Sequence, residues 1–398
     1  MRSSMKACGI VTEYNPFHNG HAYQIEQIRK NLPVDVVISV MSGNFLQRGE
    51  PAIVDKWTRT KMALAAGVDL VVELPVSSST QSADFFAKGA IQILGDLKID
   101  YLSFGVEEGL GKDFLNAAHW MVENESLISQ KMSKFESVNV PYAKQMEELL
   151  NQLAPSFPLS LNSPNNQLGF AYAKEIVRQG LAEQVELFPI QRKAVRYDDP
   201  TLHEKISIAS ATAIRQAMLE GRQIEAYIPS ESYGYLLEKM DQSVTWDDYF
   251  PYLKYQLFLQ SESSLRNIYQ MTEGLEYRLK QNIKDASSME EFLEGIKTKR
   301  YTRTRLQRLL TYVLLQFSIE EVEKALAERP SIRLLGFNKI GQRYLNENRD
   351  QIQSPFISNI NQETKDQLRM DILAGEIYTL GNKKIKKQDF TRHPIKFD

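Results

Sequence analysis

The sequence predicts an α/β protein, in which a doubly wound parallel sheet is followed by a mainly α-helical C-terminal part. Short apolar runs rich in β-branched residues recur through about the first hundred residues, and segments with apolar residues at helical spacing separate them. Such an alternation packs as a parallel sheet with helices on both faces. Beyond about residue 221 the strand pattern gives way to helical segments punctuated by prolines. We therefore expect two domains, one over residues 1–220 and one over residues 221–398.

The expected elements follow one another along the chain. Strands are predicted at residues 7–12, 34–40, 68–74, 99–104 and 185–190. Helices are predicted between them, at residues 22–32 and 86–94 among others, because apolar side chains recur there at helical spacing. A further helix should begin near Ser210. In the C-terminal part, helical patterns occupy residues 247–261, 289–298, 304–315 and 319–327.

Composition excludes several classes of protein. The chain has 398 residues, of which 42% are hydrophobic, and this is enough for the cores of two or three domains. It contains no run of about 18 apolar residues, and residues 1–6 lack the apolar stretch of a secretory signal, so we expect a cytoplasmic protein without a membrane segment. The single cysteine, Cys8, has no partner for an internal disulfide, and the five histidines form no zinc pattern. We expect no structural metal.

Charge is distributed unevenly along the chain. The formal net charge of −2 argues against attraction of the whole molecule to nucleic acid. Residues 297–308 nevertheless form a basic and aromatic cluster, and more lysines and an arginine lie between 383 and 392. These are candidate contacts to phosphate groups, although a solvated helix face explains the pattern equally well. The candidates within the cluster are Lys299, Arg300, Arg303, Arg305 and Arg308.

The strongest chemical signal lies at residues 13–21, directly after the first predicted strand. The segment reads EYNPFHNGH and leads into the first predicted helix. A strand-to-helix turn gathers backbone N–H groups and the positive end of the helix dipole, which favours a phosphate. His18 and His21 can donate hydrogen bonds to a phosphoryl group in transfer, and Gly20 lets a nucleotide approach closely. Two histidines beside a turn are usually unrelated, but this position favours the functional interpretation.

A second segment would complete such a site. Residues 207–215 place small hydroxyl residues at a predicted helix start, with an arginine about one turn later. Ser210 and Thr212 suit caps or phosphate ligands, and Arg215 suits a triphosphate. An ordinary serine N-cap explains Ser210 on its own. Together with the histidine turn, the segment predicts a nucleotide site.

Both segments resemble known signatures. Residues 18–21 resemble the HxGH signature of nucleotidyltransferases and class I aminoacyl-tRNA synthetases, and residues 210–215 resemble the ISSTxIR-like signature of adenylyltransferases, from which Ala209 and Ala211 depart. A wider set of motifs is similar to the bacterial tRNA(Met) cytidine acetate ligase family. In chain order these motifs are EYNPFHNGH at 13–21, MSGNFLQRGEP at 41–51, VELP at 72–75, SFG at 103–105, SPNNQLG at 163–169 and LLGF at 334–337.

The resemblance implies a fold and a reaction. The fold would be a Rossmann-like nucleotidyltransferase domain followed by a helical, tRNA-binding domain. Acetate would attack the α-phosphate of ATP to give acetyl-adenylate and pyrophosphate, and N4 of the wobble cytidine of elongator tRNA(Met) would then take the acetyl group. Mg²⁺ is expected only as the ion that accompanies the ATP phosphates, and no protein partner is predicted. The alternatives are a small-molecule adenylyltransferase that makes a nucleotide cofactor, and an inactive RNA-binding scaffold.

The resemblance also implies site residues. His18, His21 and Arg215 would act in catalysis. The ATP-binding residues would be Val11, Thr12, Glu13, Tyr14, Asn15, Pro16, Phe17, Asn19, Gly20, Gln24, Gly105, Arg192, Ser210, Thr212 and one of Asn165 and Asn166. At Gln24 the family often carries a third histidine, so a role that needs this imidazole is not expected here. Gln47 and Arg48 are expected in a loop beside the phosphates, where Arg48 would contact substrate or form a salt bridge within the loop.

Overall fold

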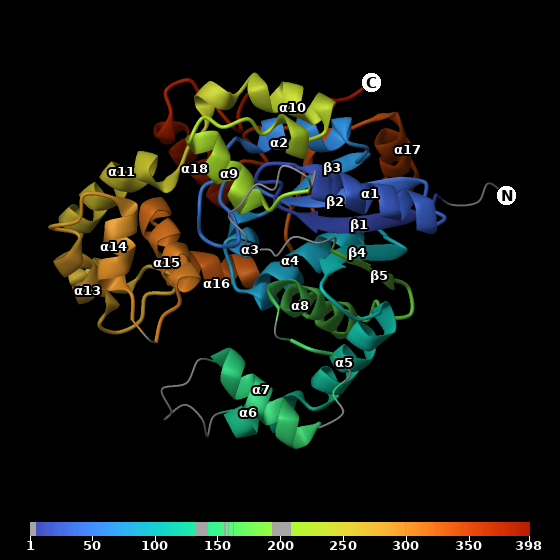
Figure 1. Cartoon of the computed structure of the whole chain (residues 1–398), viewed down its shortest axis with the longest axis horizontal. Coiled ribbons are helices and arrows are strands. Elements are labelled where there is room, and N and C mark those ends of the chain that lie inside the picture. Colours follow the sequence, from blue (N-terminus) through green and yellow to red (C-terminus); the bar gives the residue numbers. More distant parts are fainter. Residues whose placement is uncertain are drawn as a thin grey trace.

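The computed structural model describes residues 5–132, 142–154, 157, 159–161, 163–192, 208–298 and 300–398. A single sheet organises these residues (Figure 1), with strand order β5-β4-β1-β2-β3-β6-β7 and β8 paired to β6. Five strands run parallel: β1 Ala7–Thr12, β2 Val36–Ser42, β3 Leu70–Leu74, β4 Tyr101–Val106 and β5 Glu186–Gln191. All five predicted strands are confirmed.

The strand order places a ligand site. From β1 the chain moves through β2 to β3 on one side, and β4 and β5 then add to the other side of β1. The carboxyl ends of β1 and β4 therefore flank the point where the order reverses, and ligands bind at this point in open α/β sheets.

Helices cover both faces of the parallel strands. Along β2, the side chains of Val36, Ile38 and Val40 enter one core, and those of Val37 and Met41 enter the other. The first core contains α4 Ala83–Asp96, α5 Gly111–Glu123 and α8 Pro164–Arg178, and the second contains α1 Asn19–Asn31, α2 Lys56–Ala65, α9 Ala211–Leu219 and α10 Ser230–Leu237. In Figure 1, α4, α5 and α8 lie below the sheet and α2, α9 and α10 above it. The short α3 Val76–Ser79 follows β3, and α6 Glu125–Met132 and α7 Tyr142–Leu153 follow α5.

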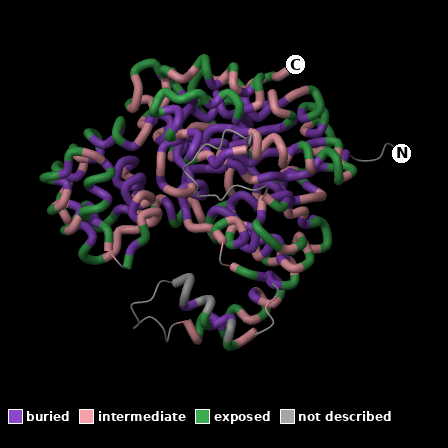
Figure 2. The backbone as a smooth tube through the Cα atoms, in the orientation of Figure 1, coloured by how far each residue is buried: buried purple, intermediate pink, exposed green. Residues whose placement is uncertain are grey.

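A helical unit with its own core lies beside the sheet. Its helices are α11 Trp246–Leu259, α12 Glu262–Arg266, α13 Leu275–Asn282, α14 Met289–Ile296, α15 Arg303–Leu315 and α16 Ile319–Ala327. The predicted helices in this part of the chain are confirmed. The core of this unit also takes Phe45 and Val76 from the sheet part and Ala374 and Tyr378 from α18 Arg369–Tyr378. Buried residues consequently run from the sheet into the helical unit (Figure 2).

The sheet contains strands from both sides of the predicted domain boundary at residue 220. The C-terminal half supplies β6 Ile332–Phe337, which is antiparallel to β3, and also β7 Phe356–Ile357 and β8 Ile395–Lys396. Helix α17 Lys339–Asn348 follows β6. Residues 221–398 are thus mainly helical, as expected, but they also complete the sheet. The division into domains 1–220 and 221–398 stays a prediction.

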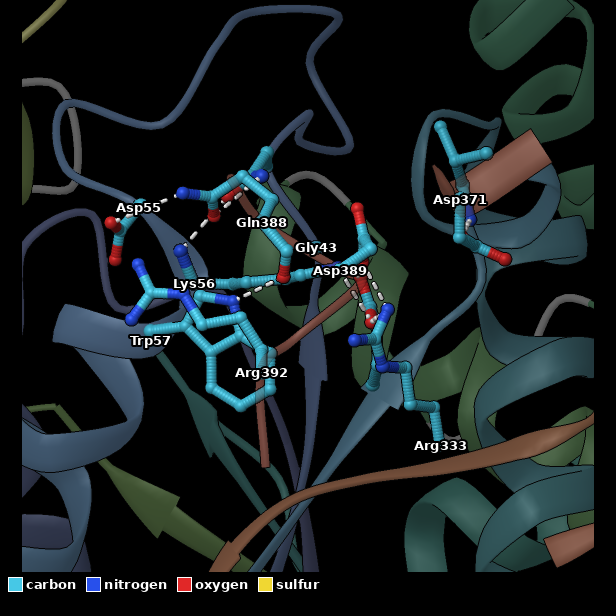
Figure 3. Close-up of polar contacts among 12 residues, drawn as sticks. Gly43, Asp55, Lys56, Trp57, Arg333, Asp371, Gln388, Asp389 and Arg392 are labelled. Carbon is cyan, nitrogen blue, oxygen red and sulfur yellow. Dashed lines mark hydrogen bonds and ion pairs between the residues drawn. The ribbon is translucent and has the colours of Figure 1, made fainter. Parts of the chain in front are cut away.

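Buried ion pairs fasten the C-terminal tail to the sheet (Figure 3). Lys56 Nζ lies 2.7 Å from Glu73 Oε1 and 3.0 Å from Asp389 Oδ1, and Arg333 also pairs with Asp389. All four side chains are at most 4% exposed. Gln388 accepts a hydrogen bond of 2.6 Å from Trp57 Nε1 through its carbonyl oxygen. The tail therefore fixes the start of α2, which follows the loop after β2.

Candidate active site

A cavity of about 280 Å³ lies at the carboxyl ends of β1 and β4. It is the place that the strand order indicates. Fourteen of the predicted site residues line it: Val11, Thr12, Glu13, Tyr14, Asn15, His18, Gly20, His21, Gln24, Gly105, Asn165, Arg192, Thr212 and Arg215. The structure thus brings together, around one space, segments that lie up to about two hundred residues apart in the chain.

The two histidines form the amino end of α1. His18 is the N-cap residue, and its Nδ1 accepts a hydrogen bond of 3.0 Å from the backbone N–H of Gly20. His21 Nδ1 accepts a hydrogen bond of 3.2 Å from the backbone N–H of His18. The pair forms a reciprocal capping arrangement, in which imidazoles replace the usual hydroxyl and carboxylate. Their ring centroids are 3.7 Å apart and the planes are inclined by 24°.

Both imidazoles are held in the neutral form. Desolvation is the largest cause and lowers the pKa of His18 to about 3, with Arg192 and Arg215 adding to the effect. Desolvation, followed by the charges of His18 and Arg192, also lowers the pKa of His21 well below its usual value. A ring nitrogen that accepts a hydrogen bond carries no proton, so each neutral ring carries its proton on Nε2. Each histidine therefore keeps one ring N–H donor besides its role as a cap.

Helix α9 brings the second predicted segment to the same cavity. Ser210 is the N-cap of this helix, and its side chain accepts a hydrogen bond of 3.1 Å from Ala213 N. Arg215 donates to the carbonyl oxygen of Asn15 at 2.9 Å and lies 3.5 Å from Glu50 Oε1. The α9 arginine is therefore bonded directly to the histidine turn. Arginine and histidine donors come from two helix amino ends that face one space.

The two neighbouring asparagines differ in place. Asn165 lines the cavity, and its Oδ1 accepts a hydrogen bond of 3.4 Å from Arg192. Asn166 is 1% exposed, accepts from Glu107 N at 3.2 Å and donates to the carbonyl oxygens of Glu108 and Ser160. The geometry favours Asn165 as the residue beside a ligand, with Asn166 holding the loop behind it.

Five predicted residues do not line the cavity: Pro16, Phe17, Asn19, Asn166 and Ser210. Phe17 is fully buried in the core on one face of the sheet, and Asn19 donates to the carbonyl oxygen of Ala226 at 2.9 Å. Their side chains stabilise the histidine turn but are not part of the cavity wall. Asn15 also supports it, because its Oδ1 accepts from Ile53 N at 2.7 Å.

Sequence reasoning missed one residue that holds the turn in place. Arg59 on α2 is fully buried and donates to the carbonyl oxygens of Glu13 (2.6 Å), Ser42 (3.0 Å) and Val54 (3.1 Å). It ties the histidine turn to the loop after β2. No pattern in the sequence marks it, because its partners are backbone atoms from distant segments.

The acidic side chain of Glu13 is part of the same connection. Glu13 Oε1 accepts from the backbone N–H of Gln47 at 2.7 Å. Desolvation raises the pKa of this carboxyl above its usual value, and the charge of Glu50 acts in the same direction. Gln47, Arg48 and Glu50 all line the cavity, so the loop after β2 lies beside it as expected.

The basic cluster divides into two groups. Arg300 and Arg305 lie over the ring of Tyr301, at 5.5 and 4.6 Å from its centroid, and Arg303 pairs with Glu290. Arg308 instead donates toward the carbonyl oxygens of Gln47 (3.5 Å) and Gln81 (3.3 Å). Arg308 therefore differs from the other three in contacting the backbone of the loop after β2. Lys299 lies outside the described residues.

Comparison with known proteins decides the family. Residues 5–393 match the family model described as HIGH Nucleotidyl Transferase. The chain belongs to this family. This HIGH nucleotidyl transferase is 40% identical in sequence to the tRNA(Met) cytidine acetate ligase of Bacillus licheniformis, over 99% of this chain and 98% of the relative. It is 41% identical to the protein of the same name from Listeria monocytogenes, over 98% of this chain and 99% of the relative. The resemblance inferred from the motifs is confirmed.

Solved structures agree with this membership. The apo crystal structure of Thermotoga maritima TmcAL matches with a TM-score of 0.88 and 29% identity, covering 99% of this chain and 100% of that one. The structure of the same protein bound with alpha-thio ATP matches with a TM-score of 0.86 over the same shares of both chains. The predicted nucleotidyltransferase fold is confirmed for this HIGH nucleotidyl transferase. Among the residues that the structure describes, no helix is both long enough and apolar enough to span a bilayer.

Proposed function

We propose that this enzyme is a tRNA(Met) cytidine acetate ligase. It activates acetate with ATP to form acetyl-adenylate and pyrophosphate. It then transfers the acetyl group to N4 of the wobble cytidine of elongator tRNA(Met), and AMP leaves. The observation that carries the proposal is the pair of neutral histidines at the amino end of α1 in the cavity, in a chain about 40% identical over its length to relatives of that name.

The geometry supports a role for both histidines in adenylate formation. An acetate oxygen attacks the α-phosphorus, the bond to the bridging oxygen of pyrophosphate breaks, and negative charge develops on the phosphoryl oxygens and the leaving group. The Nε2–H groups of His18 and His21 donate to these oxygens, and the amino end of α1 adds the helix dipole. Since both rings are neutral in the free cavity, each can donate through Nε2–H while its Nδ1 still accepts the backbone N–H that orients it. Arg215 stabilises the leaving pyrophosphate from the opposite helix end.

The ATP site is assigned to the cavity-lining residues of β1, the histidine turn and α9, together with Gly105, Asn165 and Arg192. Gly105 stands at the carboxyl end of β4, where a Cβ atom would lie 3.6 Å from Arg192 Cγ. A glycine there leaves room for a base or ribose against the backbone. Asn165, and not Asn166, offers its amide to this space.

Magnesium enters with the nucleotide. The carboxylates among the residues described as lining the cavity are Glu13 and Glu50, and each already has a partner, Gln47 N and Arg215 respectively. We infer that the phosphate oxygens of ATP and water, and not side chains, would supply most ligands of the ion, since Mg²⁺ usually keeps several waters and takes few protein ligands. When bound, Mg²⁺ would neutralise phosphate charge.

The tRNA surface is assigned to the exposed amino end of α15 and the turn before it. Arg300 and Arg305 lie there over the ring of Tyr301, Arg303 pairs with Glu290, and Lys299 belongs to the same stretch of sequence. Contacts of arginine to phosphate release counterions, so binding should weaken steeply with salt. In the Arg300→Ala, Arg305→Ala double variant we expect a lower tRNA affinity and a salt dependence shallower by about two units in slope, in filter binding at several salt concentrations. An unchanged slope would remove these residues from the interface.

Isotope exchange tests the proposed function. We expect acetate to support exchange of labelled pyrophosphate into ATP in the absence of RNA, and N4-acetylcytidine to form when elongator tRNA(Met) is added. Exchange that requires a phosphorylated cofactor precursor would support a small-molecule adenylyltransferase. If neither acetate nor a phosphorylated cofactor precursor supported exchange, the protein would be an inactive binding scaffold.

A further inference from the structure

The loop of residues 43–51 between β2 and α2, called here the β2–α2 loop, belongs to both parts of the molecule. On one side, Gln47, Arg48 and Glu50 line the cavity. On the other, the side chain of Phe45 is fully buried in the core of the helical unit. The loop is tightly closed, because Leu46 N donates to Glu50 O and Gly49 N donates to Leu46 O, both at 2.9 Å. A displacement of its outer side is therefore passed to its cavity side.

Two side chains of the helical unit are bonded to the backbone of this loop. Trp246 Nε1 donates to Gly49 O at 2.8 Å. Arg308 directs its guanidinium toward the carbonyl oxygens of Gln47 and Gln81, at 3.5 and 3.3 Å. Gly49 has a φ of 73°, and a Cβ atom there would lie 2.2 Å from the backbone nitrogen of Arg308. The loop thus packs directly on the backbone of α15, and only glycine permits this approach.

The cavity side of the loop is joined to the histidine turn. Gln47 N donates to Glu13 Oε1 at 2.7 Å, and Gln47 Nε2 donates to Gln81 O at 2.8 Å. Glu13 stands five residues before His18 in the turn. Gln47 therefore connects Arg308 to the segment that carries the histidines.

Arg308 differs from the arginines that precede it on α15. Its side chain is half-buried and faces inward, and its Nε is buried without a hydrogen-bond partner among the described residues. A buried N–H donor without a hydrogen-bond partner costs free energy, so stability alone does not explain why Arg308 stands here. The carbonyl oxygens of Gln47 and Gln81 also occupy part of the guanidinium that a phosphate of tRNA would need.

We propose that Arg308 is a positioning residue for ATP: together with Trp246 it holds the β2–α2 loop so that Gln47 and Arg48 keep their places in the cavity wall beside the triphosphate. Arg308 is not a tRNA contact. This role rests on the proposed function, since it acts on the ATP step of that reaction. The helical unit is accordingly required for adenylate formation even in the absence of tRNA.

The test compares variants of the full chain at Arg308, Trp246 and Arg278. Arg308→Met keeps the aliphatic stem and removes the donors, and Arg308→Lys restores a cation. Arg278→Met is the matched control, because Arg278 on α13 also donates to backbone carbonyl oxygens, those of Gly295, Ile296 and Lys297, but none of these belongs to the β2–α2 loop. The readouts are kcat and KM for ATP in acetate-dependent pyrophosphate exchange without RNA, and the Kd for tRNA.

We expect Arg308→Met to lower kcat/KM for ATP about tenfold or more, mainly through KM, with partial recovery in Arg308→Lys and an unchanged tRNA Kd. Arg278→Met should leave both readouts near wild type. Trp246→Phe, which keeps an aromatic ring in the core, should raise the KM for ATP about threefold through loss of one hydrogen bond. Wild-type exchange in Arg308→Met, or a loss no larger than in Arg278→Met, would overturn the proposal.

The outcomes also separate this proposal from the proposed function. If Arg308→Met lowered tRNA affinity but left kcat and KM for ATP unchanged, Arg308 would be a tRNA contact and the proposal would be wrong. If the wild-type enzyme itself showed no acetate-dependent exchange, the proposed function would fail. The positioning role would then be decided by the ATP Kd of Arg308→Met from calorimetry, where equal affinity to wild type would refute it.

Discussion

The imidazoles of His18 and His21 cap the amino end of α1 and also line the ligand cavity. His18 and His21 each use Nδ1 to satisfy a backbone N–H at the start of α1, which fixes the orientation of the rings and leaves the proton on Nε2. The burial that holds them is also the largest cause that keeps them uncharged. Their chemistry at the phosphate is therefore set by the cap geometry.

The first prediction concerns the protonation of these rings. Because the pKa of His18 is lowered to about 3 and that of His21 well below its usual value, we expect both rings to stay neutral between about pH 5 and 8 in the ATP-free protein. The unfolded chain binds protons on these rings near pH 6.5, so the folded protein loses stability as the pH falls below that value, and for His18 the loss continues toward pH 3. NMR titration of the ring protons measures this directly. A ring that titrates between pH 5 and 8 would contradict the assignment.

At the scale of elements, the cavity is built where helix ends meet strand ends. Helices α1 and α9 point their amino ends into it, while β1 and β4 supply its floor. Arg215 joins the two helix ends through the carbonyl oxygen of Asn15. A change that loosens the start of α9 should therefore weaken ATP binding as well as lower the stability of the protein.

Removing the cap of α9 tests this connection. Ser210→Ala should cost about 1 kcal/mol of stability and also raise the KM for ATP, because the first turn of α9 carries Thr212 and holds Arg215. Ser288→Ala is the matched control, since Ser288 caps α14 in the same way through Glu291 N at 3.2 Å but lies in the helical unit. We expect the control to lose similar stability in urea unfolding and to keep the wild-type KM. Equal KM values in the two variants would separate α9 from the ATP site.

The elements that the sequence predicted are those with a strong local pattern. Strands β1 to β4 are buried along most of their length and read as apolar runs, and β5 is a partly exposed edge strand that keeps a short apolar run. The histidine turn was found because a motif marks it. The strand Ile332–Phe337 is also an apolar run, but it stands among helices and pairs with β3 across more than 250 residues, so no local pattern predicts its pairing. β7 and β8 are two residues each, too short for any periodicity. Arg59 and Trp246 were missed because their partners are backbone atoms that only the tertiary structure brings close.

At the scale of the whole molecule, the two parts of the chain are interlocked. The β2–α2 loop enters the core of the helical unit, and the tail after α18 returns to α2 and β6 through buried ion pairs. In this cluster Lys56 and Arg333 face Glu73 and Asp389, so the buried charges balance. Loss of one partner should destabilise the sheet and the tail together.

Asp389→Asn tests this balance. It leaves Lys56 and Arg333 buried with one carboxylate fewer, and breaking a buried pair in this way costs about 3–5 kcal/mol. Asp241→Asn is the matched control, because Asp241 pairs with Lys384 at 2.8 Å on the exposed surface and should contribute little. Urea unfolding of both variants provides the measurement. An equal loss in the two would show that the buried cluster does not hold the tail.

The most direct test of the site is the exchange rate of His18→Asn. Asparagine is itself a good N-cap, so α1 should keep its start and the variant should fold, while the Nε2–H donor is lost. We predict that acetate-dependent exchange of pyrophosphate into ATP falls about 10²- to 10³-fold in kcat, with the ATP Kd changed far less. An exchange rate equal to that of the wild-type enzyme would show that the histidine does not stabilise the adenylyl group in transfer.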